Sequence, residues 1–261
     1  MKNKKGQILL ITVMLLATVM TVVLSISFKS VTETQITKLE EESQKALAAA
    51  ESAIDVALKE NSVNSAITTF TLGNGSLSSI TGFSGDAKID STTSKTFTTP
   101  NIAKDGSYTF YLGNYNLTTK TIGVSSAEDI TLCFQSGTPN PAIEVTLIKT
   151  GGVEKYVIDD PFLSRINGAT GASTIPPCSN GYAFSTVIPG IKIDTDGQFL
   201  LVRVLYASTK LFFSRSLSDL PLQGRTVSSQ ATSSTSTGVS KKVVLFQSYP
   251  QIPADFFTTA F

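Results

Sequence analysis

A long stretch near the start of the chain contains no residue that readily ends a helix. Neither glycine nor proline occurs between Gln7 and Leu72, and these two residues most often break helices or place turns. The stretch opens with an apolar run from Ile8 to Phe28 that carries no charge. About 20 mainly apolar residues in a helix span the hydrocarbon core of a bilayer. The sequence therefore predicts a long helix whose first part, 7–28, is transmembrane.

The charges on either side of the apolar run predict its orientation. Lys2, Lys4 and Lys5 lie in the leader 1–6, and Lys29 is the first charge beyond the run. The positive-inside bias then places the N-terminus in the cytoplasm and exports the body of the protein. A cleavable secretory signal is the alternative, with Ser25-Ile26-Ser27 as its cleavage site. The run is longer than the usual core of such a signal, and helical sequence continues beyond it.

The segment 29–60 is rich in Glu, Lys, Gln, Ala and Leu, which are strong helix formers. It is predicted to be an amphipathic helix that continues the first. Its heptad stripe consists largely of small residues, which let a sheet or another helix approach closely, whereas a dimeric coiled coil would favour larger residues. We predict that this stripe docks on the rest of the chain or on other helices. Its members are Ile36, Leu39, Ser43, Ala46, Ala50, Ala53 and Ala57.

The N-terminal layout resembles that of type IV pilins. A lysine leader ending in Gly6 precedes a membrane helix that runs into an Ala- and Glu-rich half, and the tract Glu40–Ile54 is similar to that of PilX-like minor pilins. The resemblance covers the first 58 or so residues. It implies cleavage by a prepilin peptidase between Gly6 and Gln7, with methylation of the new amino group on Gln7. It also implies an inner-membrane assembly platform and other pilin subunits as partners.

One position departs from the pilin pattern in a way that bears on assembly. Pilins usually carry a glutamate at the fifth position after the cut, where its carboxylate pairs with the amino terminus of a neighbouring subunit. This chain has Ile11 there. An unpaired amino terminus in an apolar core is costly. The resemblance therefore implies a minor, tip-type subunit of a pilus or pseudopilus that joins the filament from the inner membrane and reaches the cell surface.

The remainder, 61–261, is predicted to be one extracytoplasmic β-rich domain, so the expected fold class is α+β, a long N-terminal helix packed on a C-terminal β-rich, pilin-like domain. Short runs of β-branched and aromatic residues alternate there with turn signals. The strongest strand candidates are Tyr108–Leu112, Ile130–Phe134, Ile143–Ile148, Lys155–Ile158, Phe199–Tyr206 and Lys241–Phe246.

Two segments of this domain allow more than one interpretation. The Ser/Thr-rich tract Thr226–Ser240 fits a flexible linker or glycosylated stalk, or equally a pair of edge strands. The final segment Gln247–Phe261 ends in three phenylalanines. Exposed aromatic residues are a liability in a free tail, so we expect the segment to pack back on the domain or to contact a partner.

Cys133 and Cys178 are the only cysteines. In an exported domain a disulfide between them is plausible, and closing the loop would contribute about 4 kcal/mol on the chain-entropy estimate. The alternative is two unpaired thiols, with Cys133 acting as a small apolar core residue.

The chain offers little catalytic chemistry. It contains no histidine, which removes the usual general base and the commonest metal ligand. Asp194 and Asp196 have a calcium-like spacing, but Leu205 stands where a calcium loop needs its last glutamate. A turn between Ile191–Ile193, expected as a strand, and the strand from Phe199 is the better interpretation. We predict no enzyme activity, no metal and no cofactor.

The other acidic pairs are also assigned to loops. Asp159-Asp160-Pro161 is predicted to end a strand and begin a turn, and Glu128-Asp129 to be solvated loop charge. A formal net charge of +1 gives no support for a nucleic-acid partner. Two hypotheses outrank an envelope enzyme: a pilus subunit for adhesion, motility or uptake, and an uncleaved single-pass membrane protein that presents an adhesive β-rich domain.

Overall fold

The structure is a computed structural model that describes residues 5–63, 68–163, 165–174, 178, 181–234 and 238–253. The fold class is α+β, as predicted, with one long N-terminal helix followed by three β-sheets. The chain divides into two compact units, where the sequence analysis treated 61–261 as one domain. Unit 1 comprises residues 1–88 and 228–244, and unit 2 comprises 89–227 and 245–261.

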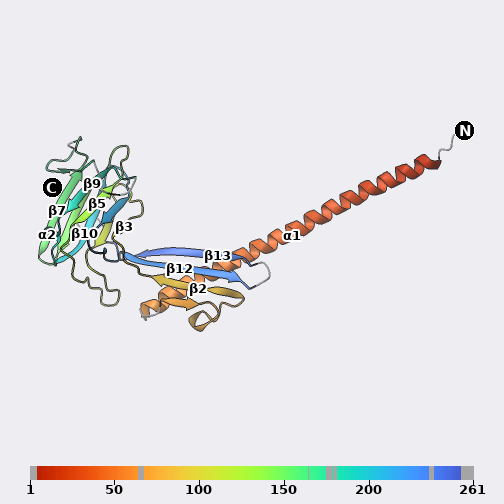
Figure 1. Ribbon diagram of the computed structural model, residues 1–261, viewed down its shortest axis with the longest axis horizontal. Coiled ribbons are helices and arrows are strands. Elements are labelled where there is room, and N and C mark those ends of the chain that lie inside the picture. The colour runs from red at the N-terminus through yellow and green to blue at the C-terminus, as the bar shows by residue number, and fades with distance from the viewer. Residues whose placement is uncertain are drawn as a thin grey trace. The chain divides into compact units, whose positions relative to one another are not determined.

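Helix α1 runs without a break from Lys5 to Val63 (Figure 1). Its 59 residues extend roughly 89 Å at 1.5 Å per residue, and it ends three residues beyond the predicted Glu60. In the apolar half, threonine hydroxyls donate to carbonyls one turn earlier, as in Thr18 to Leu15 at 2.8 Å and Thr21 to Thr18 at 2.8 Å. These side chains therefore add no unmet hydrogen-bonding group to the apolar surface.

The sheet of unit 1 has the strand order β1-β2-β12-β13. Figure 1 shows β2, β12 and β13 at the C-terminal half of α1. β2 and β12 lie very close at Gly85, where an added Cβ would come within 1.9 Å of the Gln230 carbonyl oxygen. The elements of this sheet are β1 (Thr69–Thr71), β2 (Phe83–Asp90), β12 (Gly224–Ser233) and β13 (Ser240–Ser248), and the 3₁₀ helix η1 (Gly75–Leu77) follows β1. β2, β12 and β13 each continue by a few residues into unit 2.

Unit 2 contains two sheets, with strand orders β4-β10-β6-β7-β8 and β3-β11-β5-β9. Phe110 of the first sheet stacks on Phe213 of the second with ring centroids 4.0 Å apart, and both side chains are fully buried. The two sheets thus share one apolar core. Their elements are β3 (Thr96–Thr98), β4 (Ser107–Tyr111), β5 (Ile130–Phe134), β6 (Ala142–Lys149), β7 (Gly152–Asp159), β8 (Thr170–Gly171), β9 (Phe184–Ile188), the short helix α2 (Gly190–Ile193), β10 (Gly197–Leu205) and β11 (Leu211–Ser214).

All six predicted strands are confirmed, as β4, β5, β6, β7, β10 and β13. The prediction of a strand at Ile191–Ile193 is wrong, because these residues belong to α2. Pro189 precedes this helix with φ −64°, and the Gly190 N–H donates to the Asp129 carboxylate at 2.6 Å. This bond satisfies one of the first N–H groups of the helix, which have no partner within it.

The Ser/Thr tract is not a linker, because most of its described residues lie in β12 and its last residue begins β13. Of these two strands, β13 is at an edge of the sheet, whereas β12 lies between β2 and β13. Small side chains point inward at alternate positions of β12, with Val227, Ser229 and Ala231 fully buried. Alternation with period two gives the tract a buried face despite its polar composition.

Candidate functional site

The apolar half of α1 has no protein cover. Every described side chain from Leu9 to Glu41 is exposed, including Leu16 at 69% and Phe28 at 70%. An exposed apolar surface of this length is unusual for a protein surrounded by water. The chain therefore has one N-terminal helix that is long and apolar enough to span a membrane.

The second half of α1 packs on the rest of unit 1 through the predicted small-residue stripe. Ala46, Ala50, Ala53 and Ala57 are each 0% exposed, and α1 contacts β1 and η1. Alanine lets two backbones approach closely because its side chain ends at Cβ. The stripe changes character at its N-terminal end, where the larger Ile36 and Leu39 stay 49% and 43% exposed. The docked part of the stripe thus begins near Ala46.

The residues of the expected processing site lie at the start of the same helix. Gly6 and Gln7 belong to the first turn of α1, and their side chains lie outside the described part of the chain. Ile11 is 61% exposed on the uncovered half. Its position presents an apolar side chain where the pilin pattern has a carboxylate.

Cys133 and Cys178 form a disulfide, which confirms the predicted pairing. Cys133 is fully buried in β5, and the Cα atoms are 6.5 Å apart. The bond attaches Cys178 to strand β5 of unit 2.

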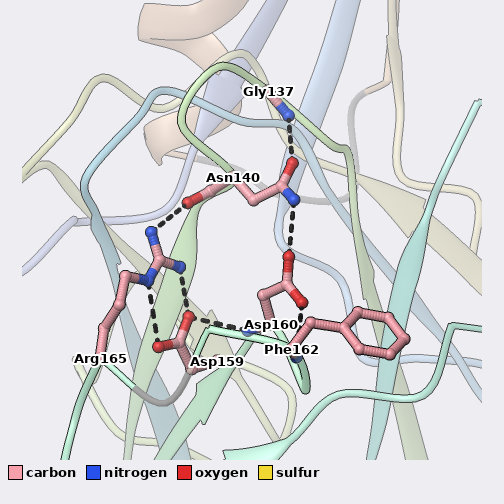
Figure 2. Close-up of polar contacts among 6 residues, drawn as sticks. All are labelled: Gly137, Asn140, Asp159, Asp160, Phe162 and Arg165. Carbon is pink, nitrogen blue, oxygen red and sulfur yellow. Dashed lines mark hydrogen bonds and ion pairs between the residues drawn. The ribbon is translucent and has the colours of Figure 1, made fainter.

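Unit 2 contains an ion pair with a buried carboxylate that the sequence did not predict. Figure 2 shows the Arg165 guanidinium facing the Asp159 carboxylate edge-on, with Nε donating to Oδ2 at 3.2 Å and Nη2 bonded to Oδ1. The guanidinium also lies 4.1 Å from the ring centroid of Tyr206. Asp159 is 2% exposed. Burial raises the pKa of Asp159, but the hydrogen bonds from Arg165 and from the Asp160 N–H outweigh it and hold the pKa below its usual value.

The neighbouring Asp160 extends this cluster to another loop. Its Oδ2 accepts from the Asn140 side chain at 2.6 Å, its Oδ1 accepts from the Phe162 N–H at 2.9 Å, and Asn140 Oδ1 accepts from the Gly137 N–H at 3.1 Å (Figure 2). Arg165 donates to the Asn140 carbonyl at 2.8 Å. The predicted strand end and turn at Asp159–Pro161 are confirmed. Because these donors engage both carboxylates, the cluster links the turn after β7 to the loop that holds Gly137 and Asn140.

Glu128 and Asp129 lie in a loop, as predicted, and Asp129 is exposed. Glu128 differs from the predicted solvated charge, because it is half-buried and accepts from the backbone N–H groups of Leu217 at 2.6 Å and Ser218 at 3.0 Å and from the Ser218 hydroxyl. Burial raises the pKa of Glu128, but these bonds outweigh it and lower the pKa to about 2. Asp129 caps α2. Both carboxylates therefore organise loops.

The described residues contain no group of three or more His, Cys, Asp or Glu placed to hold a metal ion. The two carboxylates with calcium-like spacing lie in the turn between α2 and β10. Asp194 accepts from the neighbouring Thr195 N–H at 2.7 Å. Its φ of +49° belongs to a tight turn.

Comparisons with known proteins found no match: no protein-family model matches the chain, no curated protein matches it, and no solved structure matches its fold.

Proposed function

We propose that the protein is a minor, tip-type subunit of a type IV pilus or pseudopilus, stored in the inner membrane and assembled into a filament. The observation that carries the proposal is a single unbroken helix with two differently covered halves. Leu9–Phe28 is apolar and uncovered, whereas the alanine stripe from Ala46 is fully buried against the rest of unit 1. Lipid satisfies such an apolar half before assembly, and the helices of other subunits satisfy it afterwards.

The lysines of the leader support an orientation with the N-terminus in the cytoplasm. A prepilin peptidase would then cut between Gly6 and Gln7, Gln7 would be a candidate for methylation, and an inner-membrane platform would extract the helix. Ile11 supports a minor role, because it leaves the amino terminus of a neighbour without a carboxylate partner in an apolar core. The absence of histidine from the sequence is in keeping with a structural role.

The test is the mass of the N-terminus after expression of the full chain with a prepilin peptidase. We expect the wild-type protein to lose the mass of residues 1–6, and Gly6→Leu to keep it because a bulky side chain blocks the peptidase. Lys5→Arg is the matched control, since it retains the charge and should be cut. A wild-type chain that begins at Met1 or Lys2 under these conditions would refute the proposal.

The same outcome would support the second candidate, an uncleaved single-pass membrane protein that presents a β-rich binding domain. One feature favours it: unit 2 has its own two-sheet core and an internal disulfide. Such a unit can present a binding surface without entering a filament.

A further inference from the structure

Strand β4 is at the edge of the five-stranded sheet of unit 2, and its outer edge is closed by side chains. β4 pairs with β10 on one side only. The edge strand of a sheet normally presents a row of unpaired N–H and C=O groups that invites pairing with another chain. The backbone groups of Thr109 and Tyr111 on this edge instead meet two glutamine amides.

Each glutamine amide replaces one peptide group of an absent strand. The Gln223 side chain accepts from the Tyr111 N–H at 2.8 Å and donates to the Tyr111 carbonyl at 2.9 Å. The Gln251 side chain accepts from the Thr109 N–H at 2.8 Å and donates to the Thr109 carbonyl at 3.5 Å. Thr109 and Tyr111 are two residues apart, which is the repeat at which a strand exposes groups on one edge.

A segment near the C-terminus holds one of these glutamines in place. The strap, which we define as Tyr249–Ile252, is attached to β4 by the Tyr111 hydroxyl donating to the Pro250 carbonyl at 2.6 Å and by the Ile252 N–H donating to the Thr109 hydroxyl at 2.8 Å. The predicted packing of the tail on the domain is thus confirmed for the described residues, and the three phenylalanines lie outside them. Pro250 and Gln251 are exposed, whereas the Tyr249 side chain is buried and packs on the Tyr111 ring with the centroids 5.8 Å apart. One aromatic anchor and the hydrogen bonds to β4 therefore hold the strap.

We propose that β4 is a strand-addition edge held closed by the amides of Gln223 and Gln251, and that the partner it accepts when opened is β4 of a second copy of this chain. Two β4 edges are complementary, because each offers N–H and C=O groups at Thr109 and Tyr111 with the same two-residue repeat. An antiparallel pair about a twofold axis would satisfy both. The cap therefore keeps exported units from joining sheet to sheet, independently of how the N-terminal helix assembles.

The test compares the full chain with the variant Gln223→Ala/Gln251→Ala in the same detergent. Amide hydrogen exchange at Thr109 and Tyr111 is measured at low and high protein concentration, with molar mass from light scattering. For the variant we expect at least tenfold faster exchange than wild type at low concentration, with protection regained and the mass doubled at high concentration. Wild type should stay protected and monomeric throughout.

Gln230→Ala is the matched control, because this exposed glutamine of β12 bonds only the Ser240 hydroxyl among the contacts described here, at 3.1 Å. It should behave as wild type. Gln251→Ala alone leaves the buried Gln223 in place, so it tests the edge if the double variant unfolds, and we expect faster exchange at Thr109 than at Tyr111. Fast exchange at every concentration with no change of mass would overturn the strand-addition edge, and unchanged exchange would overturn the cap.

Discussion

At the scale of single residues, two carboxylates of unit 2 hold loops in place. Asp159 and Glu128 each accept several hydrogen bonds, and each is held in the charged state by them. Sequence position placed Asp159 at a strand end but gave no sign of its partner. Arg165 lies six residues further on, and only the turn at Pro161 brings its guanidinium back to the carboxylate.

Arg165→Ala should destabilise unit 2 strongly. The substitution leaves the Asp159 charge buried without its main partner, which costs on the order of 3 kcal/mol of unfolding free energy. Urea unfolding followed by tyrosine fluorescence measures the loss. Lys192→Ala is the control, since Lys192 pairs with Glu154 at 3.6 Å with its own side chain 54% exposed, and an equal loss in both variants would contradict the role of the buried pair.

Glu128→Gln should flatten the acid dependence of stability. The folded pKa of Glu128 is about 2 against an ordinary value of 4.5, so its contribution is complete above pH 4.5 and is lost as the pH falls toward 2. The variant lacks this titration. Unfolding free energies measured between pH 5 and pH 2 should therefore fall less steeply for the variant than for wild type, and parallel curves would refute the assignment.

At the scale of elements, the sequence pattern located the helix and the main strands, but it did not predict which strands pair with one another. Runs of β-branched and aromatic residues located β5 to the residue, and the heptad stripe located the docking face of α1 from Ala46 onward. The polar tract at β12 gave two interpretations, because Ser and Thr suit both linkers and strands. Burial between β2 and β13 decided between them.

Ala50→Leu should weaken the packing of α1 on the rest of unit 1. Ala50 is 0% exposed, and a larger side chain in a filled contact costs about 1–3 kcal/mol. Ala48→Leu adds the same side chain at an exposed position two residues away and should have little effect. Thermal unfolding by circular dichroism compares the two, and an equal melting temperature would show that the stripe is not tightly packed.

At the scale of the whole molecule, the chain divides into two β-containing units, and the first of them includes a helix whose apolar half is uncovered. Buried residues of α1 begin within its second half, so the apolar first half contributes no buried side chain to either unit among the described residues. The proposed filament role and the closed β4 edge depend on this division, since one concerns the helix and the other unit 2.

A chain that starts at Lys29 should fold without detergent. The removed residues are all exposed where their side chains are described, so both units should keep their structure while the apolar surface is lost. Solubility, circular dichroism and the absence of titratable thiols without reductant measure this. Aggregation with free thiols would show that the first half of α1 is needed for folding.

The sequence by itself determined the long helix, its apolar half, the small-residue stripe and the main strands, because each depends on local periodicity and on the absence of helix breakers. Only the tertiary structure decided the division into two units, the pairing of Arg165 with Asp159 and the closing of β4 by glutamines. These contacts join residues through turns and across long sequence separations, and no local pattern encodes which distant partner satisfies a buried charge or an open sheet edge.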